Sequence, residues 1–130
     1  MAGANYQIQL RHIVVDKKEV AQLLKETIDS VNTETGRVKM LMRLAEKYSL
    51  CSSKEDGGNL GWLEIEWNAN DIRQPRGGFK GLDNEELDQV IREAVQKETI
   101  YRGILFGPVQ TRQGYHLLMI SNQFKTDRIL

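Results

Sequence analysis

The feature that most limits the possible folds is an alternating stretch near the start of the chain, YQIQLRHIVV at residues 6–15. A period of two together with β-branched residues is typical of a strand. The alternation places Ile8, Leu10, His12 and Val14 on one face of that strand. His12 is therefore expected among apolar neighbours.

Two helical stretches follow. Apolar residues recur at helical spacing from Val20 to Val31 and again from Val38 to Tyr48. Asp16 and Glu19 have the spacing of a capping box, which predicts that the first helix starts there. The stretch NLGWLEIEW at residues 59–67 then predicts a second strand.

The rest of the chain predicts a loop, a helix and a hairpin. Residues 68–84 contain three glycines and a proline without a clear period, which indicates a loop. A second capping-box pair, Asp83 and Glu86, precedes a helical stripe from Leu87 to Val95. Two apolar runs around GPVQTRQG, within residues 102–121, predict a closing hairpin.

This order of elements favours an α+β fold with helices packed on a mostly antiparallel sheet. A chain of 130 residues is large enough for one hydrophobic core. We therefore expect one domain at residues 6–124, with short tails at 1–5 and 125–130.

Composition excludes several classes of protein. Lys plus Arg balance Asp plus Glu at 18 each, so no electrostatic argument favours a nucleic-acid or membrane partner. One cysteine allows no intrachain disulfide, and with two histidines it is too little for a Cys/His zinc site. The first residues lack the apolar core of a secretory signal. A reducing, cytoplasmic-type compartment and the absence of metal and cofactor are the expectations.

Three residues are candidates for chemistry: Cys51, His12 and His116. A thiol and an imidazole that meet can form a nucleophile, but a small buried cysteine and two inward-facing strand histidines explain the same residues. If their strands are neighbours, the two imidazoles could share a hydrogen bond and hold fixed tautomers. The glycines at 57 and 58 lack Walker spacing and suit a turn. Arg73, Arg76 and Lys80 beside Phe79 suit a solvated loop better than an RNA contact.

Three segments in series resemble the signature segments of the parvulin-type peptidyl-prolyl isomerases. They are RHIVV at residues 11–15, LAEKYSLCSSKEDGGNLGW at 44–62, and GPVQTRQGYHLLMI at 107–120. The resemblance covers residues 8 to 121. It implies a four-stranded antiparallel sheet surrounded by about four helices, with the active site on the sheet under the helix that follows the second strand.

The resemblance also implies roles for individual residues. His12 and His116 match the paired histidines at the floor of the site, Cys51 the cysteine that faces the isomerising bond, and Thr111 the threonine that hydrogen-bonds with the histidines. The residues expected to contact substrate are Leu60, Leu87, Phe79, Leu82 and Gln113. Phe79 or Leu82 would take the place of the methionine that the family usually carries.

Two departures from the family pattern affect the expected substrate site. Residues 67–82 form a longer, glycine-rich insertion, and Leu87 stands where the family usually has phenylalanine. At the position of the family's phosphate-binding basic cluster, Asp16 is followed by Lys17 and Lys18 without an arginine pair. Because arginine forks are the better phosphate ligands, no strong phospho-Ser/Thr-Pro preference is expected.

The resemblance therefore implies an isomerase of Xaa-Pro bonds in proline-containing polypeptides, which is expected to assist folding or conformational switching, to need no phosphorylation and to act as a monomer. The alternatives are a parvulin-like chaperone module that binds peptides without isomerising them, and a Cys-His hydrolase. A cytoplasmic location is expected. The alternatives are an organelle interior such as the plastid stroma after loss of a targeting segment, or a domain cut from a longer protein.

Overall fold

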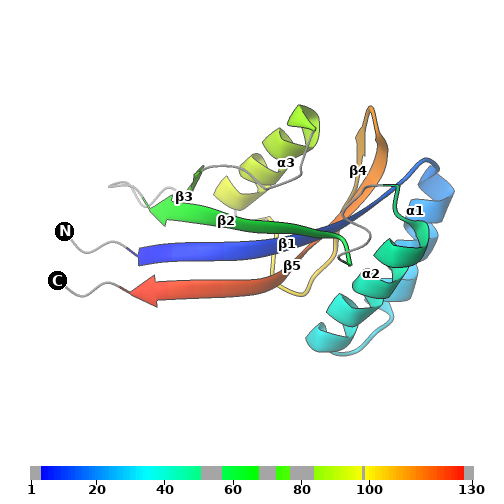
Figure 1. Ribbon diagram of the computed structural model, residues 1–130, viewed down its shortest axis with the longest axis horizontal. Coiled ribbons are helices and arrows are strands. Elements are labelled where there is room, and N and C mark those ends of the chain that lie inside the picture. The colour runs from blue at the N-terminus through cyan, green and yellow to red at the C-terminus, as the bar shows by residue number, and fades with distance from the viewer. Residues whose placement is uncertain (1–3, 51–56, 68–72, 77–83, 98, 128–130) are drawn as a thin grey trace.

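The computed structural model describes residues 4–50, 57–67, 73–76, 84–97 and 99–127. Its elements in chain order are β1 (Ala4–Val15), α1 (Lys18–Asp29), α2 (Glu34–Tyr48), β2 (Asn59–Trp67), β3 (Arg73–Arg76), α3 (Glu85–Gln96), β4 (Phe106–Thr111) and β5 (Gly114–Asp127). The strands form one antiparallel sheet in the order β3-β2-β1-β5-β4. Figure 1 shows the long strands β2, β1 and β5 running side by side.

The expected α+β class is confirmed, and so are the four predicted strands, here β1, β2, β4 and β5. The loop predicted over residues 68–84 is wrong in part, because residues 73–76 form the short edge strand β3 on β2. Four residues are too few to show a period, and Pro75 is tolerated only because β3 lies at the sheet edge. Within the described ranges there are three helices, not four.

The helix starts differ in detail from the predicted caps. α1 begins after Lys17, which makes no side-chain capping bond, so Asp16 is not its cap. The Thr33 side chain caps α2 by accepting from the Gly36 amide. The Asn84 side chain caps α3 by accepting from the Leu87 amide. Asparagine and threonine are both favoured caps because a side-chain oxygen satisfies a free amide of the first turn.

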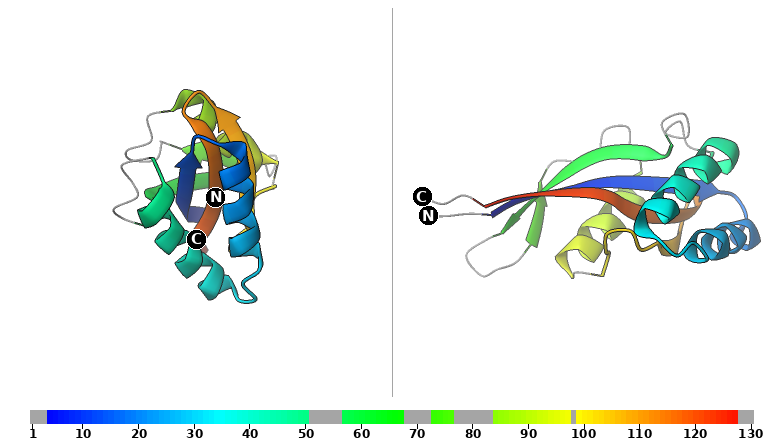
Figure 2. Two further views of the ribbon diagram at one scale, coloured as in Figure 1. Left: turned by 90° about the vertical axis from the view of Figure 1, so that its right-hand side faces the viewer. Right: turned by 90° about the horizontal axis from the view of Figure 1, so that it is seen from below.

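The sheet separates two hydrophobic clusters. Alternate residues of a strand point to opposite faces, so neighbours such as Leu117 and Leu118 of β5 belong to different clusters. One face packs against α3, and the other packs against α1 and α2. Figure 2 shows α3 and the α1–α2 pair lying on different parts of the sheet. None of the helices described is long and apolar enough to cross a bilayer.

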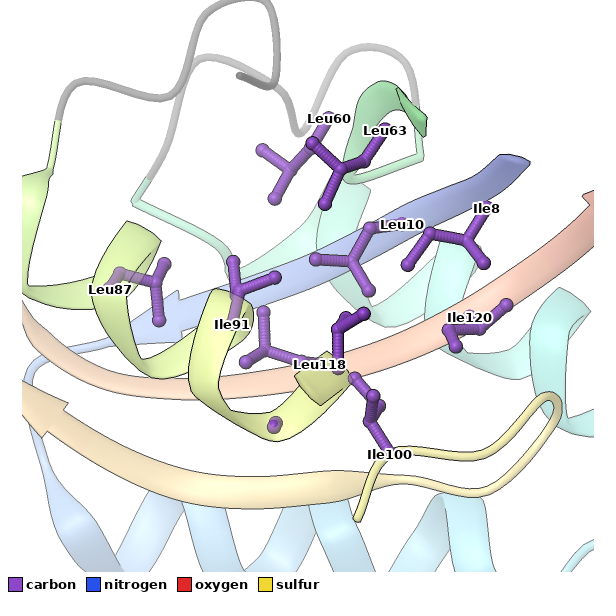
Figure 3. Packing of buried hydrophobic residues seen from close by; sticks show 11 residues of the cluster. Ile8, Leu10, Leu60, Leu63, Leu87, Ile91, Ile100, Leu118 and Ile120 are labelled. Carbon is purple, nitrogen blue, oxygen red and sulfur yellow. The ribbon is translucent and has the colours of Figure 1, made fainter. Parts of the chain in front are cut away.

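The α3 cluster forms the floor on which the candidate site is built. Its strand residues come from β1, β2 and β5, and its helix residues from α3 (Figure 3). The labelled members are Ile8, Leu10, Leu60, Leu63, Leu87, Ile91, Ile100, Leu118 and Ile120. His12 and His116 belong to the same strand faces as Leu10 and Leu118, because each stands two residues away along its strand.

The backbone approaches β1 closely beside His12. The His12 amide donates to the Gly58 carbonyl at 2.9 Å. Gly58 has a φ of +80°, and a Cβ there would stand 2.3 Å from the His12 carbonyl oxygen, so only glycine fits. At the end of α2, the Ser49 hydroxyl accepts from the Val14 amide, and the Leu50 amide donates to the Val14 carbonyl. Residues 49–50 and 58 are thus both hydrogen-bonded to β1 within two residues of His12.

Candidate active site

Two buried histidines lie face to face on the sheet. His12 comes from β1 and His116 from β5, and their ring centroids are 5.7 Å apart with 29° between the planes. The strand register explains the offset, because His116 pairs with Val14 and His12 with Leu118. The rings are therefore diagonal neighbours on one face. The expectation of a hydrogen bond between them is not met: both nitrogens of His12 and Nδ1 of His116 have no hydrogen-bond partner in the described structure.

The surroundings keep both rings uncharged. Burial lowers the pKa of His12 from 6.5 to about 4. Burial also lowers the pKa of His116 to about 4, helped by the neighbouring His12 and opposed by Glu86. Taking a charged imidazolium out of water is costly, and the attraction of Glu86 for His116 is too small to offset that cost. At neutral pH the pair is a neutral aromatic floor.

Thr111 connects His116 to the end of the hairpin. Its Oγ1 lies 2.7 Å from His116 Nε2. The same oxygen accepts from the Gln113 amide at 3.2 Å and from Asn84 Nδ2 at 3.0 Å. The tight turn between β4 and β5 holds Thr111 and Gln113 in place, because Thr111 pairs with Gly114. The predicted contact between Thr111 and the histidine pair is thus found for His116.

Asn84 is a site residue that the sequence interpretation missed. Its side chain caps α3, and its amide nitrogen donates to both Thr111 Oγ1 and Gln113 Oε1, at 3.0 and 3.1 Å. The sequence did contain an indication of this role. Asn84 stands three residues before Leu87, and a capping side chain accepts from the backbone amide at that spacing. Asp83 and Glu86 matched a capping box one residue earlier and concealed it.

Leu60 and Leu87, the two expected walls of a proline pocket, are both in the α3 cluster. Their side chains are 1% and 0% exposed. They pack with the rest of the cluster from β2 and α3 respectively (Figure 3). A ligand would reach either side chain only if the packing around it opened. Cys51, Phe79 and Leu82 lie outside the described residues.

A pocket of about 400 Å³ opens beside Thr111. It is lined by Asn84, Glu85 and Glu86 from the start of α3, and by Arg112 and Gln113 from the hairpin turn. An exposed ion pair between Arg112 and Glu86, 3.3 Å long, joins the two sides. Two of the lining residues, Asn84 and Gln113, are hydrogen-bonded to Thr111. Thr111 is in turn hydrogen-bonded to His116, so it connects the pocket to the histidine pair.

The described residues offer little for metal or acid–base chemistry. In the described ranges no three His, Cys, Asp or Glu side chains are grouped as metal ligands. Among the described residues, no carboxylate is hydrogen-bonded to either histidine, and a ring with a pKa of about 4 is a weak base at neutral pH. What the geometry provides is a buried, neutral floor beside a polar pocket.

Comparison with known proteins agrees with this geometry. Residues 10–122 match the family described as "Rotamase: PPIC-type PPIASE domain". The chain therefore belongs to the parvulin-type family of peptidyl-prolyl isomerases. It is 27% identical over 125 residues to the Rhodanese-like/PpiC domain-containing protein 12, chloroplastic, of Arabidopsis thaliana. That match covers 94% of this chain and 32% of the relative, so the chain spans about a third of that protein's length.

Solved structures show the same fold at low sequence identity. The SurA-like chaperone structure from Campylobacter jejuni described for PEB4 and Cj1289 has a TM-score of 0.64 at 20% identity, covering 95% of this chain and 42% of that one. PrsA from Bacillus subtilis has a TM-score of 0.58 at 23% identity, covering 89% and 35%. NmPin, the parvulin of Nitrosopumilus maritimus, has a TM-score of 0.55 at 21% identity and covers 87% and 92%.

Proposed function

We propose that this chain is a peptidyl-prolyl cis–trans isomerase that acts on Xaa-Pro bonds without requiring a phosphorylated residue before the proline. The observation that carries the proposal is the stacked His12–His116 pair, which is buried and neutral and in which His116 is hydrogen-bonded to Thr111. Family membership supports it, because the chain matches the isomerase domain over residues 10–122.

The reaction breaks no covalent bond. Rotation about an Xaa-Pro amide passes through a twisted state that has lost resonance, over a barrier of roughly 18–20 kcal/mol. A protein accelerates it by binding the twisted amide more tightly than either planar form. Water favours the planar amide because that form is more polar. An uncharged, poorly hydrated floor such as the His12–His116 pair therefore favours the twisted state.

The remaining roles are assigned by the same logic. The proline ring needs an apolar wall, for which Leu60, Leu87, Phe79 and Leu82 are the candidates, and Cys51 would face the carbonyl as a small polar group. Leu50, which directly precedes Cys51 in the sequence, is hydrogen-bonded to Val14 of β1. Gln113 lines the pocket, and we assign it a contact with the peptide chain next to the proline.

The segment that joins β1 to α1 supports the proposed independence from phosphate. Asp16, Lys17 and Lys18 are exposed there, and one carboxylate offsets one of the two lysines. Charge-assisted arginine forks, which bind phosphate strongly, are not part of this segment. We propose that substrates are proline-containing segments of polypeptides and that the chain acts as a monomer. The chloroplastic relative is compatible with an organelle interior as the alternative to the cytoplasm.

Exchange NMR on Ala-Xaa-Pro peptides tests the proposal. We expect cis/trans exchange to be accelerated, with similar rates for Ser-Pro and phosphoserine-Pro peptides. Cys51→Ala should slow catalysis without abolishing it, because a covalent intermediate is not needed. Binding without accelerated exchange would contradict the proposal and favour a peptide-binding chaperone module. Leu60 and Leu87 are both buried, which counts against a preformed proline pocket and therefore against efficient isomerisation.

A further inference from the structure

We propose that Asn84 is a positioning residue that fixes the tautomer of His116 through Thr111, placing the imidazole proton on Nδ1. Three consecutive hydrogen bonds, here called the relay, run from the Leu87 amide at the start of α3 through Asn84 and Thr111 to His116. The catalytic consequence of this tautomer rests on the proposed isomerase function, but the tautomer itself does not.

The relay starts at a backbone amide, which can act only as a hydrogen-bond donor. The Leu87 backbone amide can only donate, and it lies 3.0 Å from Asn84 Oδ1. The oxygen of the Asn84 amide is therefore the atom on the helix side, and its NH2 group faces the hairpin. That NH2 group has two hydrogens, and two acceptors stand at 3.0 and 3.1 Å, Thr111 Oγ1 and Gln113 Oε1.

The neighbours of Thr111 determine where its hydroxyl hydrogen points. A hydroxyl oxygen has two lone pairs and one hydrogen. One lone pair accepts from Asn84, and the other accepts from the Gln113 backbone amide at 3.2 Å, which again can only donate. The single hydroxyl hydrogen must then serve the third neighbour, His116 Nε2, at 2.7 Å. Nε2 is therefore the unprotonated nitrogen, and the neutral ring carries its proton on Nδ1.

Which nitrogen of His116 carries the proton affects how the ring is held in the site. Nδ1 of His116 is buried and has no partner among the described groups, as is true of both nitrogens of His12. The relay therefore supplies the only hydrogen bond assigned to either ring in the part of the chain that the structure describes. The rings are otherwise held by packing, so reversing the relay should change both the proton position and the orientation of His116.

Asn84→Asp separates this role from helix capping. Aspartate caps a helix as well as asparagine does, because its carboxylate accepts from the same amide. It cannot donate, so Thr111 would turn its hydroxyl hydrogen toward the carboxylate and accept from His116 instead. Asn84→Ser is the second variant, which keeps a capping oxygen without placing a carboxylate opposite Thr111. Thr33→Asp is the matched control, because it puts an acidic cap on α2, on the other face of the sheet.

The measurement is the 15N NMR spectrum of the histidine rings at pH 7, correlated to the ring carbon protons. We expect the wild-type protein and Thr33→Asp to show His116 protonated on Nδ1, and Asn84→Asp to show protonation on Nε2. Wild-type His116 protonated on Nε2, or an unchanged tautomer in Asn84→Asp, would overturn the proposal. Equal shifts in Asn84→Asp and Thr33→Asp would also overturn it, since the added charge alone would then be responsible.

A second measurement connects the tautomer to catalysis. We expect Asn84→Asp to slow catalysed cis/trans exchange about tenfold, equivalent to roughly 1.4 kcal/mol, while Thr33→Asp leaves the rate unchanged. A switched tautomer with an unchanged rate would overturn the catalytic part of the inference. If the wild-type protein fails to accelerate exchange, the proposed function fails, whereas the tautomer result is decided by the spectrum alone.

Discussion

Acid should destabilise this protein over the pH range in which its buried histidine pair takes up protons on unfolding. His12 and His116 are the two histidines of the chain, and burial lowers the pKa of each to about 4. In the unfolded chain both return to a pKa near 6.5. A base whose pKa is lowered by folding binds fewer protons in the folded state, so stability is present above pH 6.5 and is lost as the pH falls toward 4.

The size of the loss follows from these pKa values. Between pH 7 and pH 5 each histidine should lower the free energy of unfolding by roughly 2 kcal/mol, and the pair by roughly 4 kcal/mol. Domains are typically stable by about 5–15 kcal/mol, so the loss is a large part of the total. Unfolded carboxylates have pKa values near 4 and remain largely ionised above pH 5. The slope in this range therefore reports the histidines.

Urea denaturation at half-unit steps from pH 7 to pH 5 measures the slope directly. The midpoint should move to lower urea with little change in m. His12→Leu removes one buried base and also the neighbour that helps to lower the pKa of His116, so its slope should fall to half or less. A wild-type free energy of unfolding that is the same at pH 7 and pH 5 would refute the buried neutral pair.

Three further changes test the framework around the site. Leu60→Ala should lower the free energy of unfolding by about 2–5 kcal/mol, because it empties space in the α3 cluster, and a loss below 1 kcal/mol in urea denaturation would contradict this packing. Gly58→Ala should cost about 3 kcal/mol, since its φ is +80° and its Cβ would meet the His12 carbonyl. A melting temperature equal to that of the wild type would show that β1 does not approach so closely. Arg112→Ala should change stability by less than about 1 kcal/mol, because the Arg112 and Glu86 side chains are 93% and 50% exposed. A larger effect, measured in the same assay, would mean that this ion pair holds the hairpin to α3.

Local patterns in the sequence were sufficient to predict where the main strands and helices lie. Alternation in residues 6–15 identified the face of β1 that contains His12, and the two apolar runs around Gly114 identified the hairpin that contains His116. The contact between the two histidines was predicted correctly from these strands, but their geometry was not. It depends on register: His116 pairs with Val14, so the rings stack diagonally without sharing a proton.

Other features depend on tertiary structure that no local pattern records. β3 exists because β2 offers it an edge, while RQPR alone has neither length nor period. Asn84 was missed because a cap and a hydrogen bond to Thr111 are combined in one side chain, and the second partner lies 27 residues away in the sequence. The burial of Leu60 and Leu87 follows from how α3 packs on the sheet, which sequence spacing does not determine.

The pairing of the outer ends of β1 and β5 has a practical consequence. Ala4 stands opposite Asp127, so the polypeptide enters and leaves the sheet on adjacent strands (Figures 1 and 2). A short linker between those strands would close the backbone into a ring without disturbing either cluster. New ends could then be opened in the exposed turn between α1 and α2, giving a circular permutant that keeps both histidines in register. For the same reason, the whole unit could be spliced into a surface loop of a carrier protein.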